Sequence, residues 1–339
     1  MELELLKWYQ KNKRTLPWRT NPSPYAIWVS EIMCQQTRID TVIPYYLKFM
    51  DTLPTIDDLA NAKEEVLLKL WQGLGYYNRV RNMQVAAKVV VDKYQGVFPK
   101  NYEDVIKLKG IGEYTAGAIL SMAYHLPYAA IDGNALRVLS RFYASDRDIA
   151  LDQTKKFWKE KVETFKIDDF GLFNQALMDL GAMICLPNEM PKCETCPLND
   201  NCLAHQKNLE LVFPSKSGKI QKKEEELTLF LIELDGKILL RKRPSKGLLA
   251  GMYEFVHHSG KLSLEDVKEL FGSDLIRIQK GPTLSHIFTH KKWKMNSYYV
   301  KLSNYIPKEC EGFYSLEEIK EKDKQIYGQA KYIYDSVNS

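Results

Sequence analysis

The sequence predicts two domains of different fold class, an all-α domain followed by an α+β domain. The chain has 339 residues, which is enough for two separate hydrophobic cores. Helical patterns dominate from about residue 23 to about residue 206, without strand alternation of comparable strength. Beyond residue 226 the pattern changes to short strands mixed with amphipathic helices. We therefore expect domains at 1–206 and 226–339, joined by a polar linker at 207–225 that contains SKSGKIQKKEEE.

Composition is that of a soluble globular protein and gives weak guidance on partners. Hydrophobic residues make up 45% and charged residues 27% of the chain, and this balance excludes a disordered or membrane-embedded protein. No apolar run is long enough to cross a membrane, and the charged start MELELLKWYQKNKR lacks a secretory pattern. We expect a cytoplasmic monomer without a membrane partner. The net charge of +5 is a weak indication of an anionic partner.

The predicted helices of the first domain follow from apolar faces with helical spacing. In chain order we expect them at 2–13, 23–43, 57–71, 78–94, 102–108, 113–125, 135–144, 154–164 and 169–183. The stretch LPWRTNPSPY carries three prolines and predicts a connecting loop.

The second domain begins with a predicted β-hairpin. LTLFLIEL and KILLRKR are separated by Asp235-Gly236, a dipeptide suited to a tight turn with positive φ. Ser263 and Ser315 each precede an acid by three residues, which predicts two helix-capping boxes. Strand-like runs such as TLSHIFTH and KMNSYYVKL lie between these helices.

The segment SPYAIWVSEIMCQQT contains the first candidate catalytic residue, Glu31. Ser23 followed by Pro24 predicts a helix start with a hydroxyl N-cap. Glu31 lies at the edge of the apolar face of this helix, next to Trp28. A carboxyl group there is partly desolvated, which raises its pKa and makes it a proton donor near neutral pH. The alternative is an ordinary surface glutamate on an amphipathic helix.

Four of the six cysteines form a run with the spacing C-x7-C-x2-C-x5-C, at Cys185, Cys193, Cys196 and Cys202. In a cytosolic chain such a run favours a metal site or free thiols over disulfides. Four thiolates this close can enclose one tetrahedral metal or one 4Fe–4S cluster. Spacing alone does not choose between zinc and iron–sulfur.

Two further stretches can carry function. In LKGIGEYTAGAIL, Gly110 and Gly112 flank Ile111 between two helices, so exposed backbone N–H groups there can bind a DNA phosphate. The alternative is a helix–helix turn in which glycine is needed only for its φ.

Asp132 follows the apolar run YAAI and is either an N-cap or, if it faces Glu31, a second carboxylate for cleaving a glycosidic bond.

Aromatic and basic residues are interleaved in GLGYYNRVRN and LPWR, a composition suited to single-stranded or splayed nucleic acid. The aromatic rings can stack on unpaired bases while arginines such as Arg79 meet phosphates; burial in the core or on a solvated face is the alternative. His286 and His290 have the H-x3-H spacing of a helical metal site, but the strand-like pattern around them favours a structural role.

Together, LPWR, PYxxWxSExMxQQT, WQGLGYYNR, LKGIGxYTAGAI, IDGNxxRVLSR, FNQALMDLGAMIC and the cysteine run resemble the adenine DNA glycosylase family, MutY, of the helix-hairpin-helix glycosylase superfamily. The resemblance is dense over residues 5–202 and looser beyond. It implies an all-α helix-hairpin-helix glycosylase core with an iron–sulfur loop, followed by an α+β Nudix-like domain. It also implies excision of adenine mispaired with 8-oxoguanine or guanine in double-stranded DNA, after the adenine is flipped out.

The resemblance assigns roles to individual residues. Glu31 matches the general acid, Asp132 matches the aspartate that stabilises the cationic sugar, and Tyr114 falls beside the site. Arg19 and Gln175 match residues of the adenine pocket, and Gln36 and Tyr76 match residues that enter the base stack. Gly110 and Gly112 match the DNA-binding hairpin, and the four cysteines match the ligands of a 4Fe–4S cluster. Endonuclease III-like enzymes have a lysine nucleophile where this chain has Tyr114, so we expect a monofunctional glycosylase.

The second domain resembles the family's module for reading 8-oxoguanine. TLSHIF corresponds to its recognition loop, usually FSH, and places Leu284, Ser285 and His286 there; leucine in place of the aromatic weakens stacking. No REXXEE run follows GLLAGMYEF, so magnesium-dependent pyrophosphatase activity is not expected.

The first domain departs from the family pattern at two places. The first cysteine gap is one residue longer than in the family, and Cys34 occupies the place of a DNA-wedging leucine. The alternatives of another class are a catalytically silent lesion-binding protein and a zinc-binding structural protein.

Overall fold

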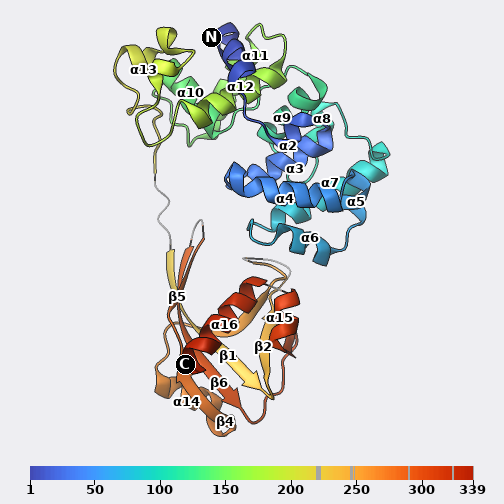
Figure 1. Ribbon diagram of the computed structural model, residues 1–339, viewed down its shortest axis with the longest axis vertical. Coiled ribbons are helices and arrows are strands. Elements are labelled where there is room, and N and C mark those ends of the chain that lie inside the picture. Colours follow the sequence, from blue (N-terminus) through green and yellow to red (C-terminus); the bar gives the residue numbers. More distant parts are fainter. Residues whose placement is uncertain (219–222, 245–246, 248, 289–290, 323, 339) are drawn as a thin grey trace. The chain divides into compact units, whose positions relative to one another are not determined.

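The computed structural model describes residues 1–218, 223–244, 247, 249–288, 291–322 and 324–338. The chain divides into two compact units, a helical unit at residues 1–218 and a sheet unit at residues 219–339 (Figure 1). In the described part of the chain, no helix is both long and apolar enough to cross a membrane.

The helical unit consists of helices joined by short loops. They are α1 (Glu2–Asn12), α2 (Pro17–Thr20), α3 (Pro24–Cys34), α4 (Ile39–Thr52), α5 (Ile56–Asn61), α6 (Glu64–Trp71), α7 (Asn78–Tyr94), α8 (Tyr102–Val105), α9 (Glu113–Tyr124), α10 (Gly133–Phe142), α11 (Asp152–Glu163), α12 (Phe170–Met183) and α13 (Leu203–Gln206), with 3₁₀ turns at Cys193–Thr195 and Asn199–Asn201.

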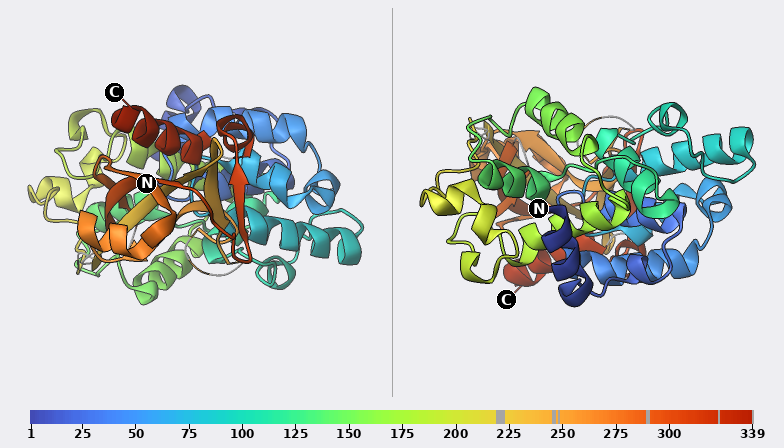
Figure 2. Two further views of the ribbon diagram at one scale, coloured as in Figure 1. Left: turned by 90° about the horizontal axis from the view of Figure 1, so that it is seen from below. Right: turned by 90° about the horizontal axis from the view of Figure 1, so that it is seen from above.

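The first helix of the unit packs against its last long helices. Leu5 and Tyr9 of α1 belong to one core cluster with residues of α10, α11 and α12, among them Leu139, Trp158 and Phe173. Figure 2 shows the N-terminal helix beside these later helices. The opposite half of the unit is organised around α3, which contacts α4 and α9 and is buried along most of its length.

The predicted helix at 23–43 is wrong, because the structure contains two helices there. The α3 helix starts as predicted, with the Ser23 hydroxyl accepting from the Ala26 N–H at 3.0 Å, but it ends at Cys34. Gln36 has a φ of +62°, a left-handed conformation that cannot continue a helix, and α4 begins only at Ile39. The prediction at 57–71 fails similarly, since α5 and α6 are separated by the extended Ala62.

The observed boundary between the units differs from the predicted linker at 207–225. Residues 207–218 belong to the helical unit, where Glu210 is buried against His205 and the Ser217 N–H donates to Asp148 at 3.2 Å. The first strand already begins at Lys223. Within the predicted linker, residues 207–218 are therefore part of the helical unit, and residues 223–225 belong to the first strand.

The sheet unit is built on one mixed sheet. Its strands are β1 (Lys223–Leu234), β2 (Lys237–Lys242), β3 (Tyr253–Ser259), β4 (Leu275–Lys280), β5 (Leu284–Ile287), β6 (Lys291–Leu302) and β7 (Glu311–Tyr314). They run in the order β4-β6-β1-β3-β2-β7, with β5 paired to β6 and with β1 parallel to β6.

Helices cover both faces of this sheet, as Figure 2 shows. One face packs on α15 (Leu316–Lys322) and α16 (Lys324–Asn338) through residues such as Leu231 and Ile333. The other face packs on α14 (Leu264–Phe271), where Phe230 and Ile232 meet Val267. Strand β1 is buried on both sides because its alternate residues serve both layers.

The local predictions for the sheet unit are confirmed. Asp235 and Gly236 have φ values of +50° and +74° and join β1 to β2, with Leu234 paired to Lys237. Both capping boxes form, at Ser263 with Asp266 and at Ser315 with Glu318. The predicted fold class, a helical core followed by an α+β domain, is confirmed.

Candidate active site

One open groove of about 1410 Å³ in the helical unit gathers six of the predicted catalytic and DNA-binding residues. It is larger than a typical small-ligand pocket, roughly 300–1,000 Å³, and can accept part of a polymer as well as one base. Its walls come from α1, α2, α3, α9, α10 and α12. The predicted residues that line it are Arg19, Glu31, Gln36, Tyr114, Asp132 and Gln175.

Glu31 lies in this groove with its carboxylate hydrogen-bonded to Tyr114. The Tyr114 hydroxyl donates to Glu31 Oε2 at 2.5 Å. Desolvation by the surrounding protein raises the pKa of Glu31 to about 7; the Tyr114 hydrogen bond and Arg19 oppose this rise, while the charge of Asp132 adds to it. The carboxyl group is therefore suited to donate a proton near neutral pH.

Asp132 is an N-cap, one of the two roles that its sequence left open, and its catalytic role stays a prediction. It is the N-cap of α10, since its Oδ1 accepts from the Ala135 N–H at 2.7 Å, and it also lines the groove with Glu31. Burial raises its pKa, but the hydrogen bonds from Ala135 and from Asn134 Nδ2, at 2.9 Å, favour the charged form. Two carboxyl groups thus share one groove with different hydrogen-bond environments.

Sequence reasoning missed Asp179, a fully buried carboxylate on α12. Its oxygens accept from Arg14 Nε at 2.8 Å and from Arg19 Nη1 and Nη2 at 2.8 and 2.9 Å. Burial by itself would raise the pKa of Asp179, yet the two arginines lower it overall. The bidentate pair fixes Arg19 on the groove wall. An acid inside the apolar run ALMDLGAM was the available signal.

Gln175 is also held in place before any ligand binds. Its Oε1 accepts from the Tyr9 hydroxyl at 3.1 Å, and its Nε2 donates to the Gly171 carbonyl at 3.2 Å. Tyr9 in turn lies 5.6 Å from the guanidinium of Arg19. The α1 helix therefore contributes to the wall through Tyr9, a residue that no local sequence pattern marks as a site residue.

The two residues predicted to enter the base stack occupy similar backbone positions. Gln36 is exposed in the turn after α3, and Tyr76 is 49% exposed in the turn before α7. Both have left-handed φ values, +62° and +50°. Arg79, for which phosphate contact and a solvated face were the two alternatives, donates to backbone carbonyls at the end of α3 and in the turn before α7.

The two hairpin glycines differ in whether their backbone conformation and their surroundings require glycine. Gly110 has a φ of +82°, and a Cβ there would lie 2.9 Å from the Cβ of Asn82. Gly112 is the N-cap of α9 with an ordinary φ of −99°, and a Cβ there would meet nothing within 4 Å. Glycine is thus structurally required at Gly110, whereas the space before Gly112 is open to an approaching group.

The four cysteines line one small cavity together with Arg141, His205 and Glu210. Arg141 Nη1 donates to Cys185 Sγ at 3.3 Å. Burial raises the pKa of Cys193 to about 11 and that of Cys196 to about 12, and neighbouring thiols contribute, so four thiolates need a cationic centre among them. This donor set fits a metal cofactor.

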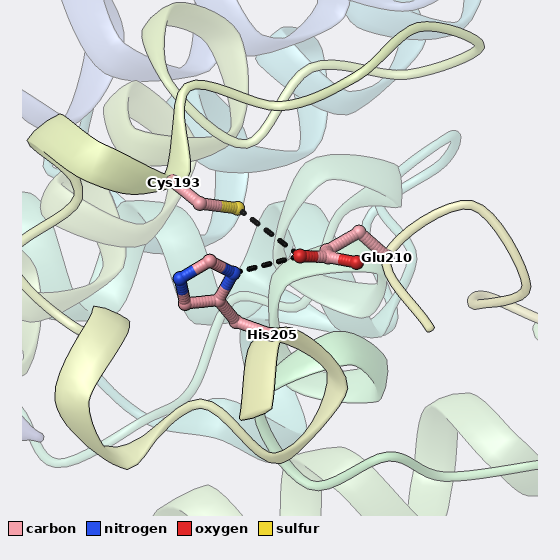
Figure 3. Close-up of side chains that lie close together, drawn as sticks. All are labelled: Cys193, His205 and Glu210. Atoms are coloured by element: carbon pink, nitrogen blue, oxygen red, sulfur yellow. Dashed lines mark hydrogen bonds and ion pairs between the residues drawn. The ribbon is translucent and has the colours of Figure 1, made fainter. Parts of the chain in front are cut away.

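A buried carboxylate adjoins the cysteines, which sequence reasoning also missed. Glu210 Oε1 lies 2.7 Å from His205 Nδ1 and 3.9 Å from Cys193 Sγ (Figure 3). Cys193, His205 and Glu210 present ligand atoms within 4.8 Å of one another. These side chains offer sulfur, nitrogen and oxygen donors, a set that also suits zinc. Zinc is therefore the alternative to an iron–sulfur cluster at Cys193, His205 and Glu210.

In the sheet unit, Leu284, Ser285 and His286 form most of strand β5 and pair with β6. Ser285 is exposed, whereas His286 is half-buried and its ring lies 4.4 Å from that of Phe288. An aromatic ring is therefore present two residues after His286, although Leu284 replaces the expected one. His290, the second histidine of the H-x3-H pattern, lies outside the described residues.

Comparison with known proteins identifies the fold of both units. Residues 29–164 match the HhH-GPD superfamily of base excision DNA repair proteins, and residues 228–324 match the NUDIX domain. A thermostable thymine-DNA glycosylase structure aligns with a TM-score of 0.56 and 29% identity over 60% of this chain and 94% of that one. A non-covalent endonuclease III–DNA complex shares the fold, with a TM-score of 0.52 and 22% identity, over 61% of this chain and 94% of that one.

The helical fold and the family match thus place the chain in the class of base excision DNA repair proteins. The adenine DNA glycosylase of Buchnera aphidicola subsp. Baizongia pistaciae is 41% identical over 74% of this chain and 72% of its own length. That of Rattus norvegicus is 34% identical over 89% of this chain and 70% of its own length. The chain belongs to the adenine DNA glycosylase family.

Proposed function

We propose that this enzyme removes adenine mispaired with 8-oxoguanine or guanine from duplex DNA by hydrolysing the N-glycosidic bond of the flipped nucleotide. The observation that carries the proposal is the arrangement of Glu31: a carboxyl group with a pKa of about 7, hydrogen-bonded to Tyr114, in a groove shared with Asp132. An adenine inside duplex DNA is inaccessible to such a group, so the base must leave the stack first.

Glu31 acts as the general acid in this reaction. Its proton passes to a ring nitrogen of adenine, which turns the base into a neutral leaving group as the bond to the sugar breaks. The bonding electrons leave with the base, and the sugar becomes oxocarbenium-like. Water then supplies the hydroxyl group at the sugar carbon and releases a proton, so that one adenine and one abasic site result.

Asp132 stabilises the positive charge on the sugar. Its carboxylate accepts hydrogen bonds from Ala135 and Asn134, which favour the charged form that this role needs. The two carboxyl groups therefore divide the work by environment, with the less hydrogen-bonded one protonated and the other ionised.

Tyr114 supports a monofunctional reaction. Its hydroxyl group donates to Glu31, and burial raises its pKa well above its ordinary value, so it does not act as an amine-like nucleophile. We expect abasic product without strand breaks until alkali is added.

The test is adenine release from duplexes that contain 8-oxoguanine or guanine opposite adenine. The unmodified enzyme releases adenine, and Glu31→Gln lowers the single-turnover rate by at least about 10³-fold while DNA binding persists, because it removes only the transferable proton. Glu160→Gln, an exposed glutamate on α11, is the matched control. Full activity in Glu31→Gln would exclude Glu31 as the acid. Binding of the duplex by the unmodified enzyme without any adenine release would favour the silent lesion-binding alternative.

We also propose that Cys185, Cys193, Cys196 and Cys202 bind a 4Fe–4S cluster, whose contribution is to shape the loop at 185–202 for DNA contact rather than to react. Four thiols lining one cavity support a cluster over a three-donor zinc site. Pure protein should be brown, with iron and sulfide near four per chain. A colourless protein that contains about one zinc per chain would contradict this.

The sheet unit is proposed to recognise 8-oxoguanine through Ser285 and His286 on β5. Support comes from the exposed Ser285 and from the rings of His286 and Phe288, which lie side by side. Ser285→Ala combined with His286→Ala should lower the rate for 8-oxoguanine duplexes more than that for guanine duplexes.

A further inference from the structure

A single half-buried arginine, Arg79, joins the two turns that carry Gln36 and Tyr76. Arg79 is the second residue of α7. Its Nη1 group donates to carbonyl oxygens at the end of α3, and its Nη2 group donates to carbonyl oxygens of the turn before α7. The acceptors are Ile32 at 2.8 Å, Met33 at 3.4 Å, Gln35, Leu74 at 3.1 Å and Gly75 at 3.2 Å.

Aromatic rings flank the same guanidinium group. Its central carbon lies 5.4 Å from the ring of Trp71 and 5.5 Å from the ring of Tyr76. The Trp71 indole N–H donates to the Gly75 carbonyl at 3.0 Å, so two side chains hold the turn that ends in Tyr76. One of the rings that packs on Arg79 is therefore itself a candidate for entering the base stack.

The chemistry of this position is unusual for a purely structural arginine. The hydrogen-bond acceptors that the structure shows for Arg79 are all neutral carbonyls, and burial lowers the pKa of its guanidinium. Partial burial of a cation without a carboxylate partner has a desolvation cost, and here the partial negative charge at the end of α3 offsets part of that cost. The planar guanidinium can address two separate sets of carbonyls, whereas a lysine presents one nitrogen.

The backbone around this arginine is in an unfavourable conformation on both sides. Gln36 and Tyr76 have left-handed φ values of +62° and +50°, a region that residues other than glycine rarely occupy. Each follows directly on a carbonyl that Arg79 binds, that of Gln35 or that of Gly75. The side chain thus stabilises both turns in the form that exposes these residues.

We propose that Arg79 is a positioning residue for base extrusion: it sets the separation of Gln36 and Tyr76, so that both can enter the duplex as adenine leaves it. This inference rests on the proposed function. Since a misplacement of about 1 Å away from the reacting atoms can cost 10²-fold in rate, the loss of one of the two connections should be measurable.

The experiment uses the full chain with Arg79→Lys, which keeps the charge but cannot bind both turns. At saturating enzyme, the single-turnover rate of adenine release should fall about 10- to 100-fold. Affinity for a fully matched duplex, which depends on phosphate contacts, should stay within about threefold. A variant that was merely misfolded would lose both.

A second measurement reports extrusion directly. In the Glu31→Gln background, a duplex with 2-aminopurine in place of the target adenine should become fluorescent when the saturating protein unstacks that base. Adding Arg79→Lys should reduce this increase at least about twofold, because the two turns no longer enter together. Trp71→Phe, which removes the other hydrogen bond to Gly75, should shift the signal in the same direction by less.

Arg147→Lys is the matched control, because Arg147 is an exposed arginine of the same unit that lies 4.0 Å from the ring of Phe157. It should change neither the rate nor the fluorescence. A wild-type rate and full fluorescence in Arg79→Lys would overturn the inference, even if its melting temperature fell. Absence of adenine release by the unmodified chain would instead overturn the proposed function, and the inference with it.

Discussion

At the scale of single residues, the proposed role of Glu31 depends on how the protein holds the proton of its carboxyl group. Desolvation raises the pKa of this carboxyl group, and the hydrogen bond from Tyr114 opposes the rise. The opposing effects leave the group near its protonation midpoint at neutral pH, where it can both hold and release a proton.

The first prediction concerns the pH dependence of adenine release. Because Glu31 must be protonated and its pKa is about 7, the single-turnover rate should fall with rising pH above that value, by about tenfold per pH unit. Tyr114→Phe removes a hydrogen bond that lowers this pKa, so the descending limb should move to higher pH. A limb that stays in place would show that Tyr114 does not act on Glu31.

The second prediction concerns Asp179. Its pKa is lowered in the folded state, so its stabilisation is present above its ordinary pKa of 3.8 and is lost as the pH falls through the folded value. Asp179→Asn should cost about 2–3 kcal/mol at pH 7, because it leaves Arg14 and Arg19 without their buried partner. Urea unfolding should show this difference, and the difference should shrink toward pH 3. Asp200→Asn, in the turn at 199–201, is the control.

The sequence allowed some of these residues to be selected and not others. Glu31 and Asp132 stand beside apolar runs, and the cysteines have a diagnostic spacing, so local pattern identifies them. Asp179 and Arg14 are 165 positions apart along the chain, and neither has a local signal for its partner. Pairings over such distances depend on the packing of α1 against α12, which spacing cannot give.

At the scale of elements, the apolar periodicity located most helices but did not detect where they break. Residues 23–43 keep an apolar pattern across the turn at Gln36, because α3 and α4 both bury apolar residues and contact each other. Periodicity reports which face is buried, and it is blind to a left-handed residue that redirects the chain. In the sheet unit, the predictions of the β-hairpin and of the capping box were accurate, because the conformations of Asp235-Gly236 and Ser263 depend on residues close to them in the sequence.

The third prediction separates the two glycines of the hairpin before α9. Gly110→Ala should destabilise the enzyme by about 1–3 kcal/mol, because of its left-handed φ and the close Cβ of Asn82. Gly112→Ala should cost less, about 0.5–1 kcal/mol, since its φ is ordinary and only the poorer N-cap preference of alanine acts against it. If a DNA phosphate approaches there, the added methyl should weaken duplex binding by about tenfold, or about 1.4 kcal/mol. Thermal unfolding and fluorescence anisotropy give the two quantities, and unchanged binding would exclude the contact.

At the scale of the whole molecule, each unit has its own core, so the proposed chemistry and the proposed recognition of the opposing base can be tested separately. The groove is made from residues 9–182, and the helices that cover the sheet belong to the sheet unit. Two independent cores are the usual basis for domains that fold alone.

The fourth prediction is that a fragment containing residues 1–218 folds and releases adenine. Its preference for 8-oxoguanine over guanine opposite adenine should fall by about tenfold, or about 1.4 kcal/mol, because the recognition strand is absent. Single-turnover rates on the two duplexes give this ratio for the fragment and the full chain. An unchanged ratio would place recognition of the opposing base within the helical unit.

The contacts that form the groove wall also determine at which stage of protein synthesis the groove can be completed. Arg19, which enters the growing chain early, takes its place only when Asp179 arrives 160 residues later, and Tyr9 likewise waits for Gln175. A ribosome-bound chain that has not yet exposed α12 therefore carries Glu31 without the wall that would seat a base against it. Incomplete translation products should consequently be inert toward the genome rather than weakly active.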